Sequence, residues 1–177
     1  MEASAQLQPT TSAVAIRYGL LTGIVLILYS FFLLVTDNMA NSALALVIYL
    51  LIIGGIVMAQ RAFRTGNDGF MSYGQGLGIG VLLSLVAGTL SSLFNYIYAT
   101  FMDPGVRERM ADQMRTKFEE AGGGMTDEQI DSIISSTQKF STGPLGLVVG
   151  VVGSVVIGFF LSLVISAILK RTRPEFE

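Results

Sequence analysis

The stretch GLGIGVLLSLVAGTLSS, residues 76–92, places a small residue at every fourth position of an apolar run. This stripe consists of Gly76, Gly80, Ser84, Gly88 and Ser92. A second stripe, in residues 146–166, consists of Gly146, Gly150, Ser154, Gly158, Ser162 and Ser166. Residues four apart share one helix face, and in a bilayer small residues permit the close backbone approach on which helix association depends. We therefore predict that both stripes are helix-packing seams and that their two helices pair directly.

The stripes repeat every four residues, whereas an α-helix turns once in 3.6 residues. Each step therefore drifts by about 40° around the helix. One straight partner is expected to contact only part of such a stripe. The prediction is either a right-handed crossing that uses the central positions or a seam that passes from one neighbour to another.

The composition places the chain in a membrane. Of its 177 residues, 51% are hydrophobic and 14% charged, and the mean hydropathy of +0.63 is too high for a water-soluble domain. A spanning helix needs about 20 mostly apolar residues. We predict an all-α, four-helix transmembrane bundle forming a single domain over residues 1–177, with its spans at residues 16–35, 43–59, 74–101 and 145–169.

Lys and Arg residues flank the spans unevenly, which predicts the orientation of the bundle. Arg17 lies at the start of the first span, Arg61 and Arg64 follow the second, and Lys170 and Arg171 follow the fourth. Cytoplasmic flanks carry the positive excess. Both termini are therefore expected in the cytoplasm and residues 102–143 outside it, although that segment also carries basic residues.

The polar segment 102–143 is expected to hold two short amphipathic helices separated by three glycines, residues 122–124. Asp103 and Pro104 suit the N-cap and first position of the first helix. Met110, Met114 and Phe118 then form an apolar edge, and we predict that these three residues dock a partner. Two readings stay open for this pair of helices: they fold over the bundle, or they bind a partner or the membrane surface.

Catalytic and metal-binding motifs do not emerge from the sequence. Apart from Arg17 at the edge of the first span, the four spans contain no Asp, Glu, Lys or Arg, and the chain has no His or Cys. Ion-coupled carriers usually place ionisable groups within the membrane, and a serine nucleophile needs a base. We expect no enzyme, no cofactor and no metal. No basic patch suggests nucleic acid as a partner.

Several blocks of the sequence resemble a known family. These are RYGLLTG at 17–23, FMSYGQG at 70–76, YIY at 96–98 with Asp103 and Pro104, GMTDEQI at 124–130, and LVISAILK at 163–170. Together they resemble the bacterial integral-membrane family of unknown function numbered 4199. The resemblance implies an inner-membrane protein with four helices and a long loop between the third and fourth. It brings no catalytic residues.

Two functions follow as expectations. The first is a structural or accessory subunit, or a scaffold, that binds itself or another membrane protein. The alternative is a channel or facilitator for small solutes, without ion coupling, in which several copies surround a pore lined by Ser residues and Gln75.

Overall fold

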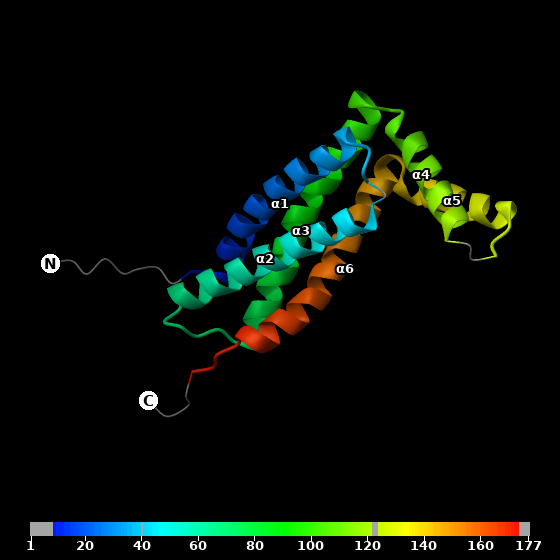
Figure 1. The fold of residues 1–177 in the computed structure, drawn as a ribbon. Helices are drawn as coiled ribbons and strands as arrows, with labels where there is room; N and C mark the ends of the chain where they lie inside the picture. The colour runs from blue at the N-terminus through cyan, green and yellow to red at the C-terminus, as the bar shows by residue number, and fades with distance from the viewer. Residues whose placement is uncertain (1–8, 40, 122–123, 174–177) are drawn as a thin grey trace.

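The computed structural model describes residues 9–39, 41–121 and 124–173, almost all of which are helical (Figure 1). Four helices are long and apolar enough to cross a membrane, which confirms the expected all-helical class. In chain order the elements are α1 (Thr11–Val35), α2 (Ser42–Gly66), α3 (Tyr73–Ile97), the π-helix η1 (Tyr98–Met102), α4 (Val106–Glu120), α5 (Asp127–Ser141) and α6 (Gly143–Leu169).

The long helices extend past the predicted apolar spans. Helix α1 begins at Thr11, so Arg17 lies well within the helix rather than at its start. Helix α2 continues beyond residue 59 to Gly66 and includes Arg61 and Arg64. Apolar runs mark the part of a helix that suits lipid, whereas hydrogen bonding continues into the polar flanks until a cap ends it.

One prediction about a helix start was wrong. Asp103 and Pro104 do not open α4, whose N-cap is Gly105. The π-helix η1 carries the preceding chain on as far as Met102, and the Asp103 N–H donates to the Tyr98 carbonyl at 2.9 Å. Gln75, which only the alternative channel reading places in a pore lining, forms a capping box with Ser72 at the start of α3.

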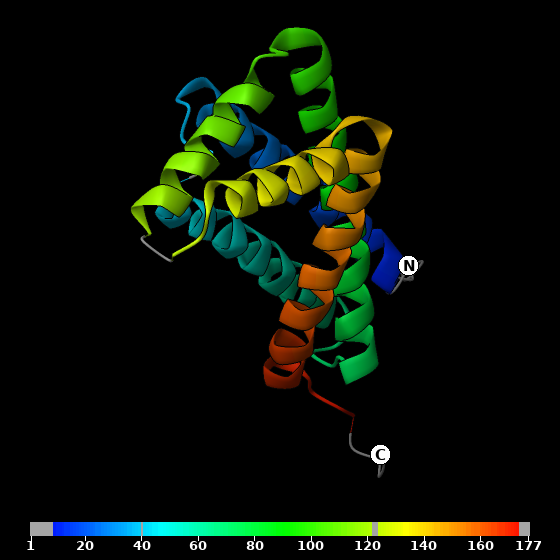
Figure 2. The same cartoon turned by 90° about the vertical axis from the view of Figure 1, so that its right-hand side faces the viewer.

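Helix α3 is the centre of the bundle, with α1, α2 and α6 packed around it (Figures 1 and 2). Gly19 and Gly23 of α1 meet Val86 and Leu90 of α3, so α1 uses its own pair of small residues for close approach. Gly19 and Gly23 lie outside the two predicted stripes.

Helices α3 and α6 run antiparallel and bring the two small-residue stripes face to face. Glycine meets serine at five successive levels, which we call the α3–α6 seam: Gly76 with Ser166, Gly80 with Ser162, Gly158 with Ser84, Gly88 with Ser154, and Gly150 with Ser92. At each level the serine side chain occupies the space that a side chain on the glycine would need. A Cβ atom on Gly80 would lie 2.7 Å from the Cβ of Ser162. Gly146 lies outside the seam, against the backbone of Ser141.

Contact along all five levels contradicts the expectation that one partner meets only the central positions. A repeat longer than 3.6 residues drifts in the sense that right-handed winding of two helices follows. Serine side chains also extend sideways from their helix axis. They can therefore contact the partner helix even where their Cα atoms have turned partly away from it. The stripe of α3 therefore stays with one neighbour.

At the end of the bundle where α1 begins and α6 ends (Figure 1), here the terminal end, hydrogen bonds join α2, α3 and α6. Gln60 of α2 is fully buried, and its Nε2 donates to the Gly76 carbonyl at 3.0 Å and to Ser166 Oγ at 2.9 Å. Met71 and Arg171 exchange two backbone hydrogen bonds of 2.8 and 2.9 Å, which join the start of α3 to the end of α6.

The opposite end, here the cap end, is open between α2 and α6. Figure 2 shows α2 leaning away from α6 toward α4 and α5. The buried residues of α2 begin at Ile52, and those of α6 begin at Gly158. The halves of both helices that lie toward the cap end therefore contribute no buried residue.

We predict that Gly80→Ile or Gly158→Ile lowers the stability of the folded protein by about 1–3 kcal/mol or more, because the opposing serine leaves no room. Gly80→Ser should also destabilise, and adding Ser162→Gly should restore most of the loss by exchanging the two partners. Thermal unfolding in detergent measures both effects. Gly78→Ile is the control, because a Cβ atom on Gly78 meets nothing within 4 Å. Equal unfolding temperatures for Gly80→Ile and the unchanged protein would contradict the seam.

Candidate functional site: the α4–α5 cap and the cavity beneath it

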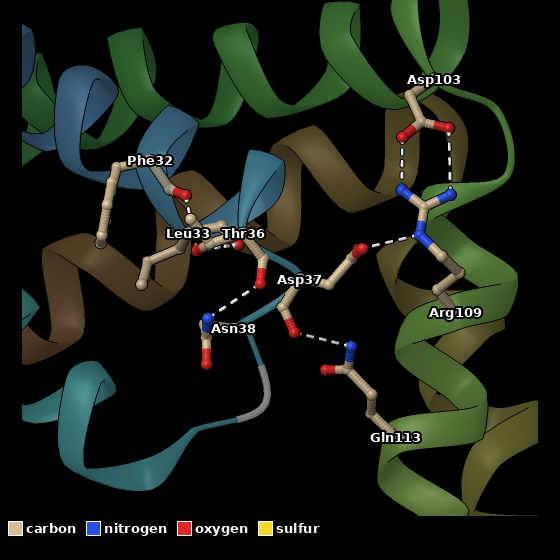
Figure 3. Close-up of polar contacts among 8 residues, drawn as sticks. All are labelled: Phe32, Leu33, Thr36, Asp37, Asn38, Asp103, Arg109 and Gln113. Atoms are coloured by element: carbon tan, nitrogen blue, oxygen red, sulfur yellow. Dashed lines mark hydrogen bonds and ion pairs between the residues drawn. The ribbon is translucent and has the colours of Figure 1, made fainter.

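Helices α4 and α5, here called the cap, are each 15 residues long and lie across one end of the bundle (Figure 2). One arginine fastens the cap. Arg109 Nε donates to Asp37 Oδ1 at 2.8 Å, while the other edge of its guanidinium pairs with the Asp103 carboxylate (Figure 3). Arg109 thereby ties α4 to the α1–α2 connection and to the residue that follows η1.

The α1–α2 connection is shaped to meet α4. Asp37 has a positive φ of 52°, a conformation that Asp tolerates better than most residues. Its carbonyl oxygen accepts from Gln113 Nε2 at 2.8 Å, one turn of α4 beyond Arg109 (Figure 3). Lys117 Nζ, a further turn along, donates to Ser42 Oγ at 3.2 Å. Three successive turns of α4 therefore contact the connection or the start of α2.

The ion pairs shift the pKa values of both partners. Hydrogen bonding from Arg109 holds the pKa of Asp103 below its ordinary value, and the backbone N–H groups of Gly105 and Val106 add to that effect. Asp103 and Asp37 in turn raise the pKa of Arg109. Both effects favour the charged forms, so the pairing is present at neutral pH.

An apolar contact reinforces the clamp. Val106 of α4, Leu34 of α1 and Tyr98 of η1 are buried together, and Met39, Phe94, Ala99 and Met110 pack against them. Met110, predicted to dock a partner, therefore contacts the chain's own bundle. Met114 and Phe118 are half-buried further along α4.

Helix α5 packs against α4 and contacts α6, which follows it directly in the chain. Ile130 and Ile134 are buried, whereas Phe140 is 60% exposed. Arg115 of α4 pairs with Asp131 of α5. The cap is thus held to itself and to the bundle, and it still presents apolar side chains outward.

Beneath the cap lies a cavity of about 520 Å³ between the diverging halves of α2 and α6. All four long helices and the first turns of α4 line it. The lining includes Leu26, Leu34, Ile48, Ile52, Leu83, Ala87 and Ile157, with Ser91, Asn95 and Arg107 toward the cap end. Its volume is within the range of about 300–1,000 Å³ that is typical of ligand sites.

The arrangement offers no recognisable catalytic group or metal site among the described residues. No three His, Cys, Asp or Glu side chains converge there as metal ligands would. The seam serines contact glycines, and Ser154 Oγ also donates to the Ser84 carbonyl at 3.3 Å. The absence of an enzyme activity, a metal and a cofactor stays a prediction.

Sequence reasoning missed three residues that the structure makes prominent: Gln60, Arg107 and Arg109. Gln60 follows directly on the predicted second span, which made it look like a flanking residue. The two arginines stand in a charged segment where no spacing distinguishes them from solvated residues.

Comparison with known proteins gives one family. The family model described as "Protein of unknown function (DUF4199)" matches residues 17–171. Searches of curated proteins and of solved structures gave no match. The matched region includes α2 to α6 entirely and most of α1, which confirms the resemblance that the sequence motifs indicated.

We predict that acid loosens the cap. Folding lowers the pKa of Asp103, so the ionised carboxylate stabilises the attachment of the cap. This stabilisation is complete above the ordinary carboxyl range near pH 4 and is lost as the pH falls through the lowered pKa. The chain has no natural cysteine, so spin labels at Leu46→Cys on α2 and Glu119→Cys on α4 can report the distance between α2 and α4. Acid should broaden the distance distribution.

In this experiment Arg109→Gln should broaden the distribution already at neutral pH, because it removes the shared partner of Asp37 and Asp103. Arg115→Gln is the matched control, since Arg115 pairs within the cap. A narrow distribution for Arg109→Gln at neutral pH would show that the apolar contact alone fastens α4.

Proposed function

The chain belongs to the DUF4199 family of proteins of unknown function, and we propose that it is a non-enzymatic accessory or scaffold protein that contacts another membrane protein through its cap. The observation that carries the proposal is the clamp at Arg109, which holds α4 in one position over the bundle. A surface that is fixed in advance loses little conformational freedom on binding.

The outward surface of the cap is suited to protein contact. Apolar residues interrupt an otherwise charged surface, as the exposed Phe140, Met125 and Ile133 illustrate. Met114 and Phe118 of α4 remain candidate docking residues, whereas Met110 helps to seat the cap on the bundle. Large apolar side chains within a polar rim are typical of protein interfaces.

The orientation and location form part of the proposal. Arg64 and Arg171 stand at the terminal end, where Arg64 Nη1 donates to the Leu169 carbonyl at 3.4 Å and Arg171 lies 5.9 Å from the Phe70 ring centroid. By the preference of cytoplasmic flanks for Lys and Arg, that end faces the cytoplasm and the cap lies outside, in a bacterial inner membrane.

We predict that a photoreactive amino acid at Phe118 or Phe140 forms one discrete heterologous adduct in native membranes. The same residue at Gly78, which is exposed on α3 away from the cap, should not. Arg109→Gln should weaken the adduct, because a mobile cap presents its surface less often in the binding geometry. Mass spectrometry identifies the product. An identical set of products from Gly78, or lipid adducts alone, would contradict docking through the cap.

The alternative channel would draw its pore lining from the stripes, between copies of the chain. The support here is for the accessory role, because the stripe serines already meet glycines within one chain and Gln75 caps α3. Stripes that pack internally leave few small polar residues for a pore.

We predict that Ser92→Cys combined with Gly150→Cys forms a disulfide within one chain. A Cβ atom on Gly150 would lie 3.3 Å from the Cβ of Ser92, close to the 3.5–4.5 Å that disulfides favour. Oxidation in native membranes should give a faster-migrating monomer, and each single variant should not. A ladder of dimers and larger species would place the stripes between copies and favour the channel.

A further inference from the structure

The cavity beneath the cap is bounded differently at its two ends. Farthest from the cap, its lining includes the aliphatic side chains of Ile52, Leu83 and Ile157. Its walls toward the cap end come from the halves of α2 and α6 that contribute no buried residue. The cavity therefore lies between the parts of α2 and α6 that diverge in Figure 2.

Polar groups gather at the end of the cavity nearest the cap. Ser91 and Asn95 of α3 and Arg107 of α4 line it there. The Ser91 Oγ atom is buried and has no hydrogen-bond partner within the described chain. Since burying an unsatisfied hydroxyl is costly, the Ser91 Oγ atom suits a ligand that brings a hydrogen-bonding group of its own.

Arg107 differs from its neighbouring arginines. Arg109 and Arg115 are each paired with a carboxylate. Across the described ranges no carboxylate lies within salt-bridge distance of Arg107, whose Nη2 donates to Thr100 Oγ1 at 3.3 Å. A guanidinium is always charged and fits the oxygens of a phosphate closely. Arg107 thus supplies a positive charge at the polar end of an apolar cavity.

We propose that this cavity binds an anionic phospholipid, with one acyl chain between α2 and α6 and the phosphate on Arg107. The order of the lining matches the ligand: a charged end, a zone of serine and asparagine for the glycerol esters, and an aliphatic end for the chain. A transmembrane helix of a partner is too wide, because a helix is about 10–12 Å in diameter with its side chains.

The site allows a blocking variant that should leave the fold intact. Gly153 lines the cavity, and a Cβ atom there meets nothing within 4 Å. Gly153→Phe therefore fills the space for the chain without displacing a neighbour. Gly78→Phe is the matched control, because Gly78 is equally unobstructed and is not part of the lining.

The test uses the full-length protein purified in detergent and titrated with phosphatidylglycerol, with native mass spectrometry to count bound lipid. Phosphatidylcholine tests the need for net negative charge, uncharged monoacylglycerol tests the chain alone, and inorganic phosphate tests the head alone. We expect binding of one phosphatidylglycerol, at least tenfold tighter than binding of the other three.

Gly153→Phe should abolish the specific binding, and Gly78→Phe should retain it. Arg107→Gln should weaken phosphatidylglycerol binding about tenfold, the scale of one charge-assisted hydrogen bond, and remove the preference over phosphatidylcholine. Arg115→Gln should change neither. Unfolding temperatures without lipid verify that the variants are folded, and phosphatidylglycerol should raise that temperature for the unchanged protein but not for Gly153→Phe.

Two results would overturn the proposal. One is equal lipid binding by Gly153→Phe and Gly78→Phe. The other is a preference for phosphatidylglycerol that Arg107→Gln leaves unchanged. Neither result depends on whether the cap contacts another protein, so the lipid site and the accessory function fail separately.

Discussion

The close contact of glycine with serine along the α3–α6 seam is the constraint on which the rest of the structure depends. Apolar side chains gain little from helix association in lipid, so the two helices are held by short-range contact and by hydrogen bonds such as that from Ser154 to the Ser84 carbonyl. Each level needs a side chain on one helix and none on the other. This pairing of a serine with a glycine at each level sets both the separation and the register of α3 and α6.

The register of the seam determines which contacts the other elements can make. It brings Ser166 beside Gly76, where Gln60 of α2 reaches both, and so closes the terminal end. Helix α2 is thus anchored to α3 and α6 at the terminal end, whereas the halves of α2 and α6 toward the cap end contribute no buried residue. The cap end is left to the clamp at Arg109 and to the apolar contact around Val106. A cavity persists where the long helices are not in direct contact.

The sequence was sufficient to predict the four helices and the pairing of the stripes, because both depend on local patterns: apolar length and a repeat of small residues. It could not predict that each level would pair one serine with one glycine, since this depends on how two distant segments align. The pairing of Asp37 with Arg109 joins residues 72 positions apart and has no sequence signature. Asp103 resembled an N-cap because the π-helix that displaces the start of α4 leaves no mark in the composition.

Gln60 also determines how the bundle can move. It is the point where a buried side chain of α2 hydrogen-bonds to both α3 and α6, so a tilt of α2 pivots there. The start of α2 lies 18 residues away, about 27 Å at 1.5 Å per residue. A tilt of about 5° would displace that start by about 2 Å, and Asp37 would carry the displacement through Arg109 into α4. A small tilt of α2 about Gln60 would therefore produce a larger displacement at the cap.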